Sequence, residues 1–298
     1  MADELIRPLA DLRRDHEAEF GGKSASLGEL IASGIPVPPG FGLSSRASES
    51  DLEQVAAAYR ALGEPPVAVR SSAIGEDSAE ATFAGLQDTY LWVRGADRVC
   101  QAVRDCWASL HNPEAVAYRA RLGDDREAAM GVTVQVMVDA EVSGVMFTCN
   151  PVSGDPSTVA VNASWGLGLA VVGGEVTPDE YRLNKVTGEL TQRTVARKHV
   201  EYVAGEEGAV EREVEDERAE ARCLDDERLA ELLDVARRVE RHFGAHQDVE
   251  WAIDRDGALF LLQSRPVTVK PKRAEAPKAK SALDLVMDTF GARREDES

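Results

Sequence analysis

Four polar side chains near the carboxyl end of the sequence have the types and spacing of a site for a metal ion and a phosphate. They lie in the segment DVEWAIDRDGALFLLQSRP (248–266), where two alternating runs flank an Asp-Gly pair that favours a two-residue hairpin turn. With that pair at the centre of the turn, Glu250 faces Gln263 and Asp248 faces Arg265. Alternation then places all four side chains on one face of the hairpin.

Each of these cross-strand pairs has a chemical use. Oxygens of Glu250 and Gln263, held roughly 5 Å apart, can jointly bind Mg²⁺, which takes few protein oxygens and fills its shell with phosphate and water. Arg265 beside them can neutralise a leaving phosphate. The opposite face, with Val249 and Trp251, is expected in the core. A solvent-facing polar stripe with an Asp–Arg ion pair fits the same residues, so the hairpin alone leaves both interpretations open.

A lysine at the start of a predicted helix is the second candidate. Lys23 follows Gly21-Gly22 and opens the amphipathic segment 23–33. The chain has seven lysines against 27 arginines, and four of the lysines lie near its carboxyl end. Free N–H groups at a helix N-terminus bind phosphate, and a lysine adds a point charge. The pattern is not a P-loop, which requires glycine where Glu17 stands. A plain glycine turn with an exposed lysine remains the alternative.

Arg70 is the third candidate, at the end of a predicted strand. PVAVR (66–70) is expected to be buried and to lead into a polar loop that starts at Ser71-Ser72. An arginine that leaves a strand beside hydroxyl groups is a natural phosphate contact. The loop 82–89, with its small and polar residues, can then fold over a phosphate tail, although an ordinary surface loop has the same composition.

The elements that must position these residues are predicted to mix helices and strands. Hydrophobic periodicity predicts helices over 23–33, 50–62 and 226–243, and two helices within 96–122. Apolar runs predict strands over 66–70, 89–93, 131–138, 143–148 and 158–163. The acidic segment 201–231 is expected to form exposed connecting or helical structure.

Composition narrows the class of protein. The 298 residues carry a net charge of −19, and 43% are hydrophobic, which suits one large domain or two lobes. The negative charge argues against binding nucleic acid or an anionic membrane through the overall field. The amino terminus has no apolar core of signal-peptide type, and the four cysteines form no C-x-x-C pair. We therefore expect a cytoplasmic protein with neither a nucleic-acid nor a membrane partner.

The order of the motifs resembles the amino-terminal nucleotide-binding domain shared by phosphoenolpyruvate synthase, pyruvate phosphate dikinase and rifampin phosphotransferase. The matching stretches span roughly residues 10–269 in the family's order. They are GGKSASLGEL, IPVPPGF, VAVRSSA, ATFAGLQDTYL, VQVMV, SGVMFT, a GLG segment followed by VTPDEY, and DVEWAID with LQSRP.

This resemblance implies an α+β, two-lobed ATP-grasp-type fold that binds ATP between its lobes. The expected divisions are an amino-terminal lobe over 1–139, a carboxyl-terminal lobe over 140–269, and a linker with an amphipathic tail helix over 270–298. The basic linker and the tail helix fit a docking element for a partner, and plain disorder is the alternative.

The resemblance also implies roles for single residues. Lys23, Arg70 and Arg265 are expected to hold the phosphates as catalytic groups, and Glu250 and Gln263 to bind Mg²⁺. Further ATP contacts are expected from the loop that covers the phosphates, from the adenine edge and from an acid that supports the cluster. These residues are Gly85, Gln87, Asp88 and Thr89 in the loop, Gln135 and Met137 at the adenine edge, and Asp248.

In the family, ATP is split to AMP and phosphate while a phosphoryl or pyrophosphoryl group passes to a histidine on a swivelling domain. None of the five histidines here lies in a segment of the G-G-x-x-S-H type. The resemblance therefore implies a subunit of a split dikinase that acts on a partner protein. That partner would carry the phosphohistidine domain and the acceptor site, whether the acceptor is pyruvate, a phenol or another compound.

Three positions depart from the family's pattern. Leu169 stands where glutamate is common, Asn162 where an acid is frequent, and Val136 where lysine is frequent. These changes affect the expected ribose and second-metal contacts and leave the four hairpin residues untouched. Two alternatives therefore stay open, a catalytically idle nucleotide-binding regulatory subunit and a stand-alone ATP-grasp ligase that would release ADP.

Overall fold

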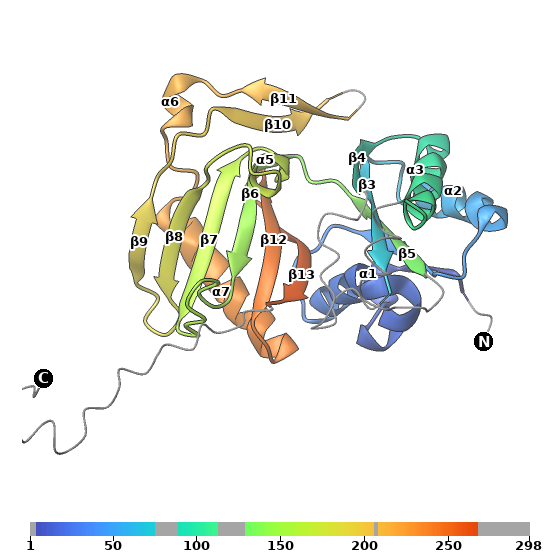
Figure 1. The fold of residues 1–298 in the computed structure, drawn as a ribbon, viewed down its shortest axis with the longest axis horizontal. Helices are drawn as coiled ribbons and strands as arrows, with labels where there is room; N and C mark the ends of the chain where they lie inside the picture. The colour runs from blue at the N-terminus through green and yellow to red at the C-terminus, as the bar shows by residue number, and fades with distance from the viewer. Residues whose placement is uncertain (1–3, 75–88, 113–128, 206–207, 268–298) are drawn as a thin grey trace, which may run out of the picture.

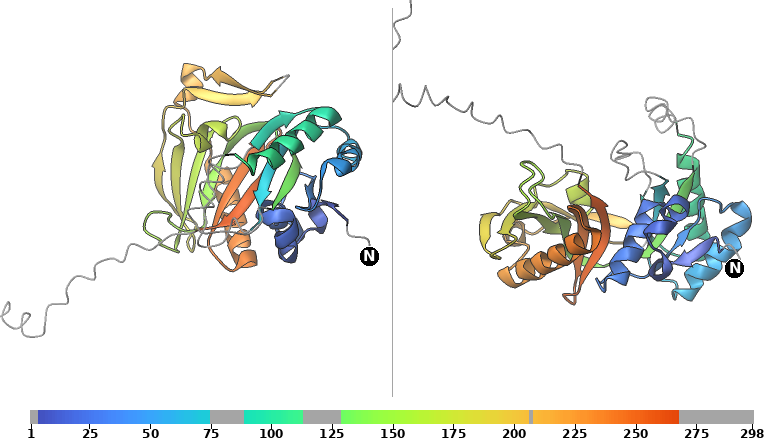
Figure 2. Two further views of the ribbon diagram at one scale, coloured as in Figure 1. Left: turned by 45° about the vertical axis from the view of Figure 1, so that its right-hand side comes forward. Right: turned by 90° about the horizontal axis from the view of Figure 1, so that it is seen from below.

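The structure is a computed structural model that describes residues 4–74, 89–112, 129–205 and 208–267. These residues form two large antiparallel sheets, in two lobes that lie side by side, and one two-stranded hairpin (Figures 1 and 2). Helices and sheets occur together in both lobes, which confirms the predicted α+β class. Within the described residues, no helix has the length and apolar character needed to cross a membrane.

The first lobe is a five-stranded sheet with two helices packed on it. Its strands run in the order β1 (Ile6–Pro8), β2 (Gly40–Leu43), β5 (Met130–Val136), β3 (Val67–Ala73) and β4 (Thr89–Val93). The helices are α2 (Leu52–Ala61) and α3 (Ala96–Ser109), and short 3₁₀ turns occupy Leu9–Asp11, Arg14–His16 and Glu49–Asp51. Their apolar faces share a core with the sheet around Tyr59, Val69 and Val103.

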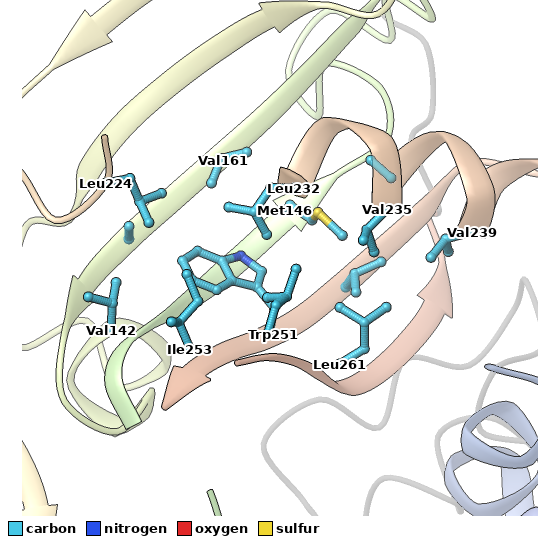
Figure 3. Packing of buried hydrophobic residues seen from close by; sticks show 14 of the residues in the cluster. Val142, Met146, Val161, Leu224, Leu232, Val235, Val239, Trp251, Ile253 and Leu261 are labelled. Atoms are coloured by element: carbon cyan, nitrogen blue, oxygen red, sulfur yellow. The ribbon is translucent and has the colours of Figure 1, made fainter. Parts of the chain in front are cut away.

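The second lobe is a six-stranded sheet. Its strands run in the order β13 (Leu259–Pro266), β12 (Gln247–Asp254), β6 (Ala140–Phe147), β7 (Thr158–Trp165), β8 (Asp179–Asn184) and β9 (Leu190–Thr194). The helix α7 (Asp226–Phe243) covers one face, and its Leu232 and Val235 pack over Trp251 of β12 (Figure 3). The side chain of Asp225 caps the first turn of α7, and Gly244 ends the helix in the left-handed conformation.

The helix α1 (Glu17–Ala32) connects the two lobes. It lies beside β13, and its Leu27 and Leu30 belong to the same core cluster as the inner face of α7. Residues from the amino-terminal part of the chain thus help to build the core of the second lobe. The division of the chain at residues 139 and 140 stays a prediction.

The acidic segment 201–231 is helical in part, as predicted, over Asp216–Ala219 and from Asp226 onward. Its first part differs, because it forms a two-stranded hairpin, β10 (Val200–Ala204) and β11 (Ala209–Glu213), which lies across the upper end of the second sheet in Figure 1. The short helices α5 (Leu169–Val172) and α6 (Asp216–Ala219) flank it. Glu201 is only 2% exposed, and Arg212 and Arg218 both pair with it. Part of the charge of the acidic segment therefore lies in a buried ion-pair cluster.

Candidate functional site

A cleft of about 200 Å³ lies between the two sheets. Strands β3, β4 and β5 supply one wall, and β6, α5 and the β12–β13 hairpin supply the other. Five of the residues predicted from sequence line this cleft: Arg70, Thr89, Gln135, Met137 and Glu250. Residues far apart in the sequence are therefore brought to one place.

The hairpin pairs its four polar residues as predicted, but it does so by a different route. Glu250 lies opposite Gln263, and Asp248 lies opposite Arg265. The turn is longer than the predicted two residues, since the backbone N–H of Asp254 bonds the carbonyl of Ala258 at 3.0 Å. A β-bulge next to Glu250 restores the register that the longer turn shifts by one residue.

The Glu250–Gln263 pair fits a cation. Gln263 is 6% exposed, and its Oε1 is buried without a hydrogen-bond donor among the described residues. An acceptor oxygen left unpaired in the interior costs free energy unless a ligand or water satisfies it. The described part of the chain holds no cluster of three or more His, Cys, Asp or Glu. A cation here would thus rely on few protein oxygens, as Mg²⁺ does when phosphates complete its shell.

Arg70 connects the first lobe to this pair. Its Nη2 donates to Glu250 Oε2 at 3.0 Å, and its Nη1 donates to the carbonyl of Leu262 at 3.2 Å. Leu262 is the extra residue of the bulge, so the irregularity that corrects the register also turns a carbonyl toward Arg70. Arg70 Nε is buried without a partner in the described part of the chain.

The strand that carries Arg70 is longer than predicted. Ser71 and Ser72 continue β3 instead of opening a polar loop, because both are fully buried and pair with β5. Across the other edge of β3, Arg70 lies opposite Thr89 at the start of β4. The remaining predicted loop residues, Gly85, Gln87 and Asp88, lie outside the described residues.

Asp248 and Arg265 form the second ion pair of the hairpin. Arg265 Nε donates to Asp248 Oδ2 at 2.9 Å, with the arginine 42% exposed and the aspartate 14% exposed. Burial raises the pKa of Asp248 above its ordinary value, although Arg265 acts in the opposite direction. Asp248 thus holds the arginine in place, although neither residue is among those that line the cleft.

Lys23 lies in the first turn of the helical segment that follows a break in α1, which agrees with the predicted helix start. The break is at Gly21, whose φ is +81°. A Cβ there would lie 2.1 Å from Ser72 Oγ, so only glycine lets β3 approach so closely. The same hydroxyl accepts a hydrogen bond from the backbone N–H of Lys23 at 3.1 Å. Since Ser72 and Arg70 share one face of β3, the break brings Lys23 toward the face that carries Arg70.

The other end of the cleft is more apolar. Gln135 is 3% exposed, and its Nε2 has no partner among the described groups. Met137 next to it lines the same end. The segment around α5 belongs to this wall, where Leu167, Leu169 and Val171 contribute apolar surface. Of these residues, the sequence pointed only to Leu169, through its departure from the family's pattern.

The positions that depart from the family's pattern differ in their relation to the cleft. Leu169 and Val136 both line it. Asn162 lies in β7 opposite Val145 and is not among the residues that line the cleft. The change at Leu169 therefore bears directly on what the cleft can bind.

Comparison with known proteins places the chain in a family. The family model for the pyruvate phosphate dikinase AMP/ATP-binding domain matches residues 49–284. The chain belongs to this family. A probable phosphoenolpyruvate synthase of Methanothermobacter thermautotrophicus is 37% identical over 339 residues, which cover 95% of this chain and 49% of the relative. A rifampicin phosphotransferase of a Streptomyces species is 38% identical over 317 residues, covering 90% of this chain and 36% of that protein.

These matches confirm the resemblance drawn from the motifs. The chain contains the ATP-binding domain of the pyruvate phosphate dikinase family, and it spans about half the length, or less, of these relatives. Among solved structures, D-alanyl-alanine synthetase A from Vibrio cholerae matches 92% of this chain and 64% of that chain, with a TM-score of 0.39 and 14% identity. An N5-carboxyaminoimidazole synthase from Aspergillus clavatus matches 83% and 44%, with a TM-score of 0.40 and 11% identity. These likenesses are weak, and the family assignment rests on the sequence.

Proposed function

We propose that the chain is the ATP-binding phosphotransferase subunit of a split dikinase similar to phosphoenolpyruvate synthase. It binds Mg·ATP in the cleft, releases AMP, and transfers a phosphoryl or pyrophosphoryl group to a histidine of a partner protein. Water accepts the remaining phosphoryl group in the first case and removes the outer phosphate of the pyrophosphoryl group in the second, so free phosphate and phosphohistidine result. The observation that carries this proposal is the pairing of Glu250 with Gln263 across the hairpin, with Arg70 bonded to the same carboxylate.

Each polar side chain of the site has its own role in this proposal. Glu250 and Gln263 would hold Mg²⁺, which supplies charge neutralisation on the reacting phosphates. Arg70 and Arg265 bind phosphate oxygens from either side of this pair, and Lys23 adds a third cation. Such fixed positive groups stabilise the charge that develops on a transferring phosphoryl group and on its leaving group.

The rest of the cleft suits the nucleoside. Gln135 offers an unpaired amide N–H to a base, and amide donors of this kind give a purine site its orientation. Met137 and the α5 side chains give apolar surface for the ring and the sugar. The resulting order is base at the apolar end and phosphates at the hairpin.

A histidine from outside the cleft agrees with the described geometry. The five histidines of the sequence all fall within the described residues, and none of them lines the cleft. The group that accepts the phosphoryl in this proposal must therefore approach from elsewhere, as a histidine on a swivelling domain of a partner would do.

The nucleotide product tests the proposal. ATP labelled at the β and γ positions is incubated with the chain, Mg²⁺ and the histidine-bearing part of a phosphoenolpyruvate synthase. We expect AMP, free phosphate and phosphohistidine, and we expect Glu250→Gln to lower the rate by about 10²–10³-fold. ADP as the product would instead indicate a ligase. AMP formed at the same rate without any histidine protein would contradict the proposed transfer.

A second candidate is a nucleotide-binding regulatory subunit without catalysis. Leu169 favours it, because an apolar side chain lines the cleft where the family commonly has glutamate. Nucleotide binding without phosphohistidine in either the unaltered chain or Glu250→Gln would decide for this candidate.

A further inference from the structure

The ion pair between Arg70 and Glu250 joins two side chains that the proposed function assigns to different ligands. Arg70 comes from β3 of the first lobe and Glu250 from β12 of the second, and their atoms lie 3.0 Å apart. The side chains are only 13% and 25% exposed. Figure 1 shows β13 at the edge of the second sheet that is nearest to the first lobe. A phosphate ligand and a carboxylate ligand of the metal are thus bound to each other.

The atoms around this pair are only partly satisfied. Arg70 Nε and Gln263 Oε1 are both buried without hydrogen-bond partners among the described residues. One is a donor suited to an anion and the other an acceptor suited to a cation. While Arg70 and Glu250 neutralise each other, Arg70 Nε can still bind an anion and Gln263 Oε1 can still bind a cation.

The local charge explains why the two ligands should bind together. In the two ion pairs next to Gln263, Arg70 balances Glu250 and Arg265 balances Asp248. A divalent cation added alone would leave two uncompensated positive charges in a partly buried place, which is costly. A triphosphate added alone would meet the Glu250 carboxylate. When both arrive, Arg70 can turn to the phosphate and Glu250 to the cation, so each charge keeps an opposite partner.

We propose that the Arg70–Glu250 pair couples metal binding to nucleotide binding. Arg70 leaves Glu250 for a nucleotide phosphate, and Glu250 then becomes available to the divalent cation. This inference rests on the proposed Mg·ATP site and adds that the site binds metal weakly without nucleotide and nucleotide weakly without metal. Linkage requires the two effects to be equal in size.

The first test measures Mn²⁺ binding by electron paramagnetic resonance, with and without ATP. We expect weak Mn²⁺ binding to the unaltered chain alone and tight binding with ATP. Arg70→Met frees Glu250, so Mn²⁺ alone should bind about tenfold more tightly, within the usual range of coupling between ligands. Arg70→Lys keeps the charge and should behave more like the unaltered chain.

The chain offers a matched control ion pair. Arg255 pairs with Asp139 at 3.1 Å, at the turn end of the same hairpin and about half exposed. Arg255→Met removes the same charge and should leave Mn²⁺ binding unchanged. An equal gain in Arg255→Met and Arg70→Met would overturn the proposal, as would tight Mn²⁺ binding by the unaltered chain without ATP.

The reciprocal test measures ATP binding by calorimetry in EDTA. Glu250→Gln releases Arg70, so ATP without metal should bind several-fold more tightly than to the unaltered chain, whereas Asp139→Asn should change nothing. This arm keeps the proposal falsifiable if Arg70→Met does not fold. An unaltered chain that binds no ATP even with Mn²⁺ would refute the proposed function. A chain that binds Mn·ATP but shows no coupling in either arm would refute only this inference.

Discussion

Two ion pairs of the molecule, one in the cleft and one in the second lobe, use the same chemistry in opposite ways. Lys198 and Asp179 are both fully buried, with Nζ and Oδ1 2.6 Å apart. Both oxygens of Asp179 accept a further donor, the N–H of Ala196 and Cys223 respectively, and Oδ2 also accepts from Tyr181. Every acceptor position around Asp179 is in use.

The cleft pair leaves binding atoms unused. Arg70 and Glu250 are partly exposed, and their neighbourhood contains a buried donor and a buried acceptor without partners in the described part of the chain. A buried pair whose polar atoms are all bonded has no atom left for a ligand, and loss of either partner is costly. A pair with unbonded polar atoms nearby can still bind a ligand. Both clusters contain charged side chains. They differ in whether the polar atoms have partners among the described residues, which all have around Asp179 and some lack around Glu250.

The largest expected effect is on stability at the Lys198–Asp179 pair. Lys198→Met leaves the Asp179 carboxylate buried without its counter-charge and should lower the free energy of unfolding by about 3–5 kcal/mol. Arg70→Met should lower it by only about 1 kcal/mol, because Glu250 can reach water. Urea denaturation of both variants measures the difference, and equal losses would break the comparison.

A smaller loss is expected where the cleft depends on close backbone approach. Gly21→Ala combines a positive φ with a Cβ that would overlap Ser72, so it should cost about 3 kcal/mol of unfolding free energy. Gly63→Ala is the control, because Gly63 has a φ of +86° and open space around it, and it should cost about 1 kcal/mol. Similar thermal unfolding of the two variants would mean that β3 gives way to the added methyl group.

The smallest effect is expected at a contact between α1 and α7 outside the cleft. Glu29 accepts from the N–H of Arg14 at 3.0 Å and lies 2.8 Å from His242 Nε2. Burial alone would raise the pKa of Glu29, but these two hydrogen bonds, together with the charges of His242 and Arg13, hold the pKa below its ordinary value of 4.5. Its stabilisation is therefore complete above that pH and is lost as the pH falls through the lowered pKa.

Glu29→Gln should thus be less stable than the unaltered chain by about 0.5 kcal/mol at pH 7, with the difference fading in acid. Urea denaturation at several pH values measures this, with Glu53→Gln on the exposed side of α2 as the control. A difference that grows as the pH falls would contradict the assigned sign.

Much of the geometry of the candidate site could be predicted from sequence, although part of the reasoning behind the prediction was wrong. The pairing of Glu250 with Gln263 was right although the turn was wrong, because a bulge cancels the shift. No local pattern predicts that bulge, whose extra residue, Leu262, accepts a hydrogen bond from Arg70 of the first lobe. The small number of lysines outside the carboxyl-terminal part of the chain made Lys23 a candidate. Lys198 is another of these few lysines, yet it belongs to the buried cluster around Asp179. The burial of Glu201 could not be predicted from sequence. Its partners, Arg212 and Arg218, lie in the same acidic segment, and the hydrophobic pattern there does not show which side chains come together.

Two glutamines of the β12–β13 hairpin test the central claim most directly. Gln247 is satisfied, since its Oε1 accepts from Ser264 at 2.9 Å and its Nε2 donates to the carbonyl of His246 at 3.1 Å. Gln263 has an unpaired Oε1. Gln263→Met should weaken Mn²⁺ binding in the presence of ATP by about tenfold or more while leaving stability unchanged or higher. Gln247→Met should lower stability by about 1–3 kcal/mol and leave Mn·ATP binding unchanged. Normal Mn·ATP binding by Gln263→Met would contradict the account.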